Sequence, residues 1–137
     1  MIRESAIRIP FRYAAGAAGS RFLVALRDEQ RILGGRCAAC ARVYAPLRSF
    51  CGVCGGTPLA EVEIGPGGAV QSWTEKAGGA VFALVTLDGA DTALLHLLLA
   101  ASGEAYCGMR VHARFAAERR ASILDIAGFE PEQRGTT

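Results

Sequence analysis

Four of the five cysteines in this chain form two Cys-x-x-Cys pairs, and this feature constrains the fold more than any other. The pairs stand ten residues apart, at Cys37, Cys40, Cys51 and Cys54. Each pair lets two sulfurs from one tight turn face the same centre, and a hairpin that joins the pairs gives tetrahedral thiolate coordination. Gly52, Gly55 and Gly56 supply the backbone freedom that the second turn requires. The spacing predicts a zinc ribbon, with two disulfides or an iron centre as the alternatives.

The predicted metal is structural, because four protein sulfurs leave no coordination position for water. Such a ribbon folds because it binds metal. The fifth cysteine, Cys107, has no Cys-x-x-Cys partner and is expected to be a small buried side chain. His96 and His112 fall in predicted strands, with no nucleophile or acidic partner in a recognisable arrangement. We therefore expect hydrogen-bonded strand histidines and no catalytic group.

Composition places the chain among ordered globular proteins, since 51% of its residues are hydrophobic and 20% are charged. No apolar run approaches the roughly 18 residues that a spanning helix needs, so a membrane protein is not expected. The first residues lack the pattern of a secretory signal. We expect a cytoplasmic protein, in which thiols stay reduced and clustered cysteines bind metal.

The chain is expected to divide into four segments: residues 1–34, 35–64, 65–131 and a flexible tail at 132–137. In the first segment, the run 14–20 is too rich in glycine for a stable helix interior, so Ser20 is expected to cap a helix over 21–30. Gly34 and Gly35 are expected to follow its end. An apolar stripe at helical spacing supports this helix: Phe22, Leu23, Ala25 and Leu26.

The pattern changes to strands after the linker at 65–68. Five short runs are separated by turns that mostly contain glycine: 69–77, 81–88, 92–100, 109–119 and 122–129. Asp88 and Asp91 flank one such turn, and turn formation explains them. We predict a mainly β fold, in which an N-terminal helix and a zinc ribbon precede a five-stranded barrel like the oligonucleotide/oligosaccharide-binding (OB) fold. Closure of the barrel is not visible in the sequence.

Charge is distributed unevenly along the chain. Residues 1–54 carry nine arginines against three acidic side chains, a formal charge of +6, while the remainder carries −4. Any attraction for an anionic partner therefore belongs to the N-terminal third. The alternative is a solvated arginine-rich surface.

Several segments of the chain, taken in order, resemble a known protein family. The order of ILGGRCAACARVYAPLRSFCGVCG, a Gly-rich link, VFALVTLDGADTALLH, GMRVHARF and IAGFEP resembles the thiolase-associated family, over roughly residues 11–131. That family pairs a rubredoxin-like zinc ribbon with an OB barrel. The leader FRYAAGAAGSRFLVALRD is similar to members that partner enzymes acting on larger acyl-CoA substrates. One departure is APLR at 45–48, where relatives carry two prolines.

The resemblance implies a non-catalytic accessory subunit, docked on a thiolase-fold partner that acts as an acyl-CoA thiolase, acyltransferase or side-chain aldolase. It implies a heterotetramer of two partner chains and two of these chains, stabilisation of the partner, and a coenzyme A thioester bound jointly. Guanidinium groups pair with phosphate bidentately, so the candidate contacts for coenzyme A phosphates are Arg36, Arg42 and Arg48. Which reaction and which acyl group the partner handles stays open.

Two other functions remain open. Zinc ribbons and OB barrels are frequent nucleic-acid modules, so single-strand binding is the main alternative. Only 7% of the residues are aromatic, and the predicted barrel is net acidic, which disfavours that reading. A barrel that binds a small acyl ligand without a partner is the third possibility.

Overall fold

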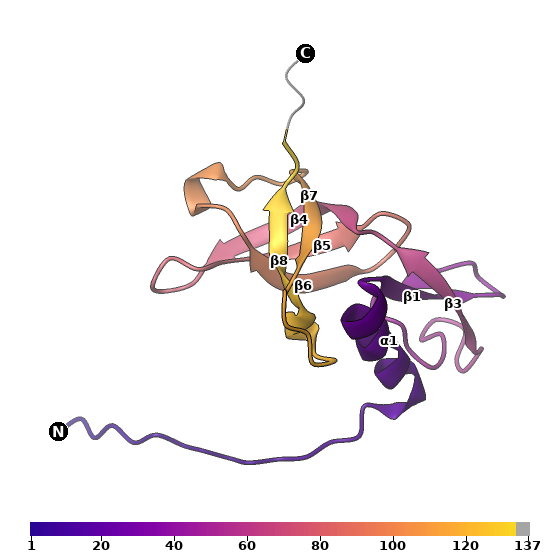
Figure 1. Ribbon diagram of the computed structural model, residues 1–137, viewed down its shortest axis with the longest axis horizontal. Helices are drawn as coiled ribbons and strands as arrows, with labels where there is room; N and C mark the ends of the chain where they lie inside the picture. The colour runs from indigo at the N-terminus through magenta and orange to yellow at the C-terminus, as the bar shows by residue number, and fades with distance from the viewer. Residues whose placement is uncertain (134–137) are drawn as a thin grey trace.

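The computed structural model describes residues 1–133 as one helix followed by two β-sheets (Figure 1). The helix is α1, Gly16–Glu29. The ribbon sheet has the order β2-β1-β3, with β1 Ile32–Cys37, β2 Val43–Tyr44 and β3 Leu59–Ile64. The second sheet is a closed barrel of order β4-β5-β6-β8-β7, with β4 Gly67–Glu75, β5 Val81–Leu87, β6 Ala93–Leu98, β7 Arg110–Phe115 and β8 Ile126–Pro131. Two short 3₁₀ helices are η1 Ser102–Glu104 and η2 Ile123–Asp125.

This architecture confirms the predicted mainly β class, with a ribbon before a five-stranded barrel. Counted within the barrel, the strand order is 1-2-3-5-4, which is a Greek-key arrangement that the OB fold shares. The tail expected at 132–137 lies outside the described residues from 134 onward.

The helix α1 begins earlier than predicted. It starts at Gly16, with Ala15 as its N-cap residue, so the prediction that Ser20 caps the helix was wrong. Ala18 packs against the core, and this tertiary contact outweighs the poor helix propensity of the flanking glycines. The predicted apolar stripe of the helix is confirmed, because Phe22, Ala25 and Leu26 are buried and Leu23 packs against the same core. No helix within residues 1–133 has the length and hydropathy needed to cross a bilayer.

The ribbon sheet is built around two glycines of β1, Gly34 and Gly35. A Cβ on Gly34 would come 2.7 Å from the carbonyl oxygen of Tyr44, and one on Gly35 would come 2.9 Å from Leu59. These contacts are shorter than real Cβ atoms make, so the neighbouring strands can approach only where side chains are absent. The prediction that Gly34 and Gly35 follow the end of the helix is confirmed, and the structure adds that both belong to β1.

The barrel closes through a narrow contact between β6 and β8. These strands are parallel and pair only at Leu98 and Phe129, and the Leu99 N–H donates to the Phe129 carbonyl at 2.7 Å. Phe129 is fully buried beneath this junction. The other neighbours in the barrel pair in antiparallel fashion over longer stretches. Closure thus depends on a contact between residues about thirty positions apart.

The segment 122–129, predicted to be one strand, contains the short helix η2 followed by the start of strand β8. Ser122 Oγ accepts a hydrogen bond from the Leu124 N–H at 3.2 Å, which favours the short helix η2. Asp125 is 3% exposed, and its carboxylate accepts hydrogen bonds from three successive backbone N–H groups, those of residues 120–122. These local side-chain bonds replace strand pairing, so β8 begins only at Ile126.

The turn between β5 and β6 attaches the barrel to the ribbon. The Asp91 carboxylate accepts a hydrogen bond from the Val43 N–H at 2.8 Å, and the Asp91 N–H donates to the Val43 carbonyl at 2.8 Å. Thr92 Oγ1 accepts from the Ala45 N–H at 2.8 Å. Turn formation alone does not account for Asp91. Its partner is 48 residues away, so no local pattern could reveal the contact.

Replacing Asp91 with alanine is expected to destabilise the chain by roughly 1–2 kcal/mol, because the Val43 N–H loses its side-chain acceptor in a partly buried place. Urea denaturation with zinc present measures the change. Asp91→Asn keeps an acceptor oxygen and is the matched control, with a smaller expected loss. An unchanged midpoint for Asp91→Ala would show that the ribbon and the barrel do not depend on this contact.

Candidate metal centre

The two cysteine pairs converge on one point. Cys37 Sγ lies 3.8 Å from Cys54 Sγ, and Cys40 Sγ lies 3.8 Å from Cys51 Sγ. All four sulfurs lie within 4.8 Å of one another. A tetrahedron with metal–sulfur bonds of about 2.3 Å has edges of about 3.8 Å. The sulfur positions therefore fit a tetrahedral Zn²⁺, and they are too far apart for S–S bonds of about 2.05 Å.

The first cysteine pair follows β1 directly. Cys37 is the last residue of that strand, and its carbonyl accepts a hydrogen bond from the Ala41 N–H at 2.9 Å. Its own N–H donates to the Arg42 carbonyl at 2.9 Å. Ala41 closes the turn with φ of 60°, a left-handed conformation that costs energy for a residue with a Cβ. The chain here has no glycine to relieve this turn.

The second cysteine pair sits in the loop between β2 and β3. The Cys54 N–H points at Cys51 Sγ at 3.4 Å, as expected in a metal-binding knuckle. Gly55 and Gly56 have φ of +67° and +117°, so the predicted need for glycine is confirmed at these two positions. Gly52 does not adopt a left-handed conformation, and its expected role in the turn was wrong.

A tyrosine that the sequence analysis did not assign to the site supports one of these sulfurs. Tyr44 is 4% exposed, and its hydroxyl lies within hydrogen-bond distance of Cys51 Sγ, at 3.3 Å; this hydrogen bond lowers the pKa of the Cys51 thiol to about 6. Hydrogen bonds with Cys40 and Cys37 instead raise the pKa of the Cys54 thiol to about 12. Four thiolates so close together repel one another, and a divalent cation removes that repulsion. The chemistry of the donor set thus calls for a metal ion.

Three arginines proposed for coenzyme A phosphates are exposed on the ribbon: Arg36, Arg42 and Arg48. The structure brings two of them to one side chain, since the guanidinium carbons of Arg42 and Arg48 lie 5.6 Å and 4.7 Å from the centre of the Tyr44 ring. Arg36 pairs through its backbone with Val43. No carboxylate within residues 1–133 pairs with any of the three. Their guanidinium groups are thus available to an anion.

Other arginines of the N-terminal third are already neutralised. Arg21 bonds Glu29 and Glu61 at 2.8 Å and 2.9 Å. Arg31 bonds Glu29 and Glu63, and Arg27 bonds its neighbour Asp28. The pairs Arg21–Glu61 and Arg31–Glu63 connect α1 and the residue before β1 to β3, whereas Arg27–Asp28 lies within α1. The excess positive charge is therefore concentrated at the start of the chain and on the ribbon.

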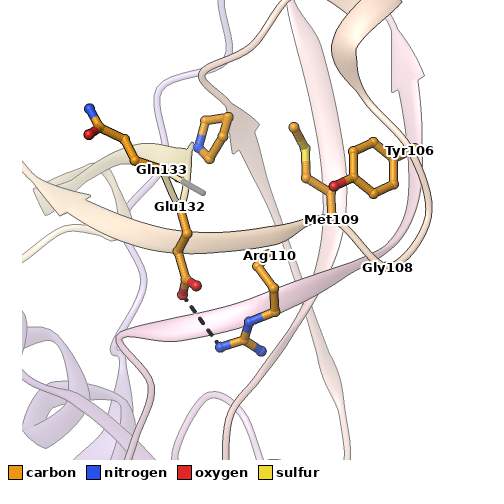
Figure 2. A pocket seen from close by; sticks show the side chains of 7 residues that line it. Tyr106, Gly108, Met109, Arg110, Glu132 and Gln133 are labelled. Carbon is orange, nitrogen blue, oxygen red and sulfur yellow. Dashed lines mark hydrogen bonds and ion pairs between the residues drawn. The ribbon is translucent and has the colours of Figure 1, made fainter. Parts of the chain in front are cut away.

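A hollow of about 430 Å³ at one end of the barrel contains a further arginine, Arg110 (Figure 2). Arg110 donates to both oxygens of Asp88, and its Nη2 lies 3.4 Å from a Glu132 oxygen. This guanidinium lowers the pKa of the Asp88 carboxyl. Two carboxylates already compensate its charge, which makes the hollow a poor site for phosphate.

Both histidines are hydrogen-bonded strand residues, as expected, but the expectation that neither has an acidic partner was wrong for His112. His96 is 8% exposed, and its Nδ1 accepts from the Leu97 N–H at 2.8 Å. His112 Nε2 lies 2.8 Å from a Glu130 oxygen. Within residues 1–133, neither ring makes a hydrogen bond with a serine, threonine or cysteine side chain. Cys107 is exposed, so its predicted burial was wrong; the turn that Gly108 closes with φ of +88° leaves it at the surface.

Comparisons with known proteins agree with this geometry. Residues 24–60 match the family model of the ChsH2 rubredoxin-like zinc ribbon domain. A chain of the Ltp2–ChsH2(DUF35) aldolase superposes with a TM-score of 0.63 and 25% identity, covering 88% of this chain and 98% of that one. A DUF35-family protein of unknown function from Sulfolobus solfataricus superposes with a TM-score of 0.63 and 22% identity, covering 85% of each chain. No curated protein matched the sequence.

The fold and the cysteine cluster define a zinc-ribbon protein with a closed five-stranded barrel. Residues 24–60 are similar to the ChsH2 rubredoxin-like zinc ribbon, and over most of its length the chain has the fold of DUF35 proteins. The resemblance inferred from the sequence is confirmed at this level. The ribbon match also favours zinc over iron for the four-cysteine site.

Proposed function

We propose that this chain is a non-catalytic, zinc-binding accessory subunit of a thiolase-fold enzyme complex that acts on acyl-CoA. The observation that carries the proposal is the match to a chain of the Ltp2–ChsH2(DUF35) aldolase, which extends over 98% of that chain. A match of this extent includes the helix, the ribbon and the barrel together. It therefore supports the same role in an enzyme complex more strongly than the ribbon match alone.

The arrangement of the cysteine and histidine side chains supports an accessory role. In the described part of the chain, the only cluster of cysteines is closed by four sulfurs, which leaves a bound metal no open position for substrate. Among the described residues, neither histidine makes a hydrogen bond with a nucleophilic side chain. In the proposed complex the partner supplies the reacting groups, and this chain supplies a rigid surface held by zinc at Cys37, Cys40, Cys51 and Cys54.

The exposed arginines of the ribbon are the proposed contacts for coenzyme A phosphates. Arg42 and Arg48 stack near one aromatic ring, which orients both guanidinium groups before a ligand binds. We further propose a heterotetramer in the cytoplasm, in which this chain stabilises the catalytic partner. The division of the chain at residues 34/35, 64/65 and 131/132 also stays a prediction.

Co-expression with a thiolase-fold subunit from the same organism tests the proposal. The pair is expected to elute as one complex that cleaves or condenses an acyl-CoA, while this chain alone gives no turnover. Light scattering on the eluted peak measures the stoichiometry, and chromatography of coenzyme A esters measures the reaction.

Turnover by the isolated chain would contradict the accessory role. Absence of a complex, together with a salt-dependent gel shift on single-stranded DNA, would favour the nucleic-acid alternative instead. A large rise in melting temperature with coenzyme A and no partner would favour an independent acyl-binding barrel.

A further inference from the structure

The first fifteen residues, called the arm below, form neither helix nor strand and are exposed throughout. Figure 1 shows the arm leaving α1 and running away from it toward the N-terminus. Large apolar side chains recur along it, with exposed fractions of 81%, 73%, 77% and 77% at Ile7, Ile9, Phe11 and Tyr13. A contiguous exposed row of this kind marks a surface that binds another molecule.

The arm is suited to bind in an extended conformation. Pro10 lacks an N–H and cannot continue a helix, and it restricts Ile9 to extended backbone angles. The apolar residues occupy alternate positions from 7 to 13, so an extended arm places them on one face. The Phe11 and Tyr13 rings already stack, with centroids 6.1 Å apart, which puts both on the same side. The opposite face carries Arg8 and Arg12.

Charge indicates what kind of surface the arm binds. Its three arginines against one glutamate leave a formal charge of +2. No carboxylate within residues 1–133 pairs with Arg3, Arg8 or Arg12. The complementary surface is an apolar groove for the odd-numbered face, with carboxylates along its rim for the arginines.

A second copy of this chain offers a poorer fit. An apolar hollow of about 340 Å³ lies between β6 and η2, and its lining includes Leu95, Leu97 and Leu124. No carboxylate lines this hollow, so it can take the apolar face of an arm but leaves Arg8 and Arg12 without partners. Charge complementarity therefore favours a different protein.

We propose that the arm docks as an extended peptide in an apolar, carboxylate-rimmed groove of the catalytic subunit. This inference rests on the proposed function, which identifies that subunit as the partner. Fifteen extended residues span up to about 50 Å, far enough to reach a surface well beyond the one that the ribbon and barrel contact. The side chains of the arm make no hydrogen bond or ion pair with the rest of the described chain, so substitutions within the arm are expected to affect binding and to leave folding intact.

The test compares arm variants in the full chain for binding to the co-expressed thiolase-fold subunit. Ile9→Ser with Phe11→Ser is expected to weaken affinity by roughly tenfold or more, through the loss of two large apolar contacts. Zinc content and melting temperature are expected to be unchanged. Ala6→Ser with Ala14→Ser makes two changes to serine in the same exposed segment, removes no large side chain, and is expected to bind like the wild type.

Arg8→Glu with Arg12→Glu tests the rim of the groove. Its affinity is expected to fall severalfold at low salt, and the difference from the wild type is expected to shrink at high salt. Equal loss at all salt concentrations would contradict a rim of carboxylates.

The outcomes separate this inference from the function on which it rests. If the wild-type chain forms no complex with the thiolase-fold subunit, the proposed function fails. If the wild type binds and Ile9→Ser with Phe11→Ser binds equally well, the arm proposal fails while the proposed function holds. An arm-dependent dimer of this chain alone, or arm-dependent binding to phosphatidylserine vesicles, would also overturn the proposal.

Discussion

Replacing Cys37 with serine is expected to abolish stoichiometric zinc binding and to unfold the ribbon, residues 32–64. Cys37 is fully buried, and its sulfur lies within 4.8 Å of the other three. Structural zinc binds zinc-finger peptides with roughly 10–16 kcal/mol near neutral pH, and most of that free energy is folding free energy. Loss of one thiolate leaves three clustered sulfurs without a tetrahedral ion, so the knuckles have no other interaction strong enough to hold them.

Elemental analysis gives zinc per chain, and amide hydrogen exchange shows which strands open. Protection is expected to fall in β1, β2 and β3, and to persist longer in the barrel. Cys107→Ser is the matched control, because that cysteine is exposed and lies outside the cluster. A Cys37→Ser chain that keeps one zinc ion and its ribbon protection would show that the metal does not hold this part of the fold.

Replacing Phe129 with alanine is expected to cost about 3–5 kcal/mol of stability, which is the usual range for a fully buried phenylalanine. Phe129 is 0% exposed, pairs with Leu98 where the barrel closes, and lies edge-on to the His96 ring at 5.9 Å. Domains of this size have total stabilities of roughly 5–15 kcal/mol, so the variant is expected to be close to unfolding.

Chemical denaturation at constant excess zinc measures this loss without disturbing the metal site. Leu95→Ala on the neighbouring strand β6 is the control, since Leu95 is 61% exposed and its loss is expected to change stability by less than about 0.5 kcal/mol. Similar losses for the two variants would contradict the view that the junction of β6 and β8 is a main site of barrel stability.

Local sequence patterns were sufficient to predict the four metal-binding cysteines. The four sulfurs come together because each Cys-x-x-Cys pair forms one tight turn of four residues, and the short strand Val43–Tyr44 lies between the two turns. The hydroxyl of Tyr44 was not recognised as part of the site, because it reaches Cys51 across the ribbon. No spacing rule connects a tyrosine to a thiolate seven residues away.

Propensity was a weaker guide where tertiary contacts compete with it. The glycines near the start of α1 predicted a loop, but packing of Ala18 and Phe22 against the core made it helical. Residues 122–125 were predicted to be strand, but Ser122 and Asp125 hydrogen-bond the local backbone and form η2. Both errors arise where one or two side-chain contacts outweigh the average preference of a segment.

The amino-acid sequence by itself determined the elements with a short-range physical cause: the four-sulfur ribbon, the buried stripe of α1 and the short strands of a small barrel. Only the tertiary structure decided how they join, through the Leu98–Phe129 junction, the Asp91–Val43 bonds and the exposure of the arm. The reason is that these contacts join residues far apart in the chain, or depend on a surface left uncovered after folding. Their free energy appears only when the whole chain is assembled, so no window of sequence contains it.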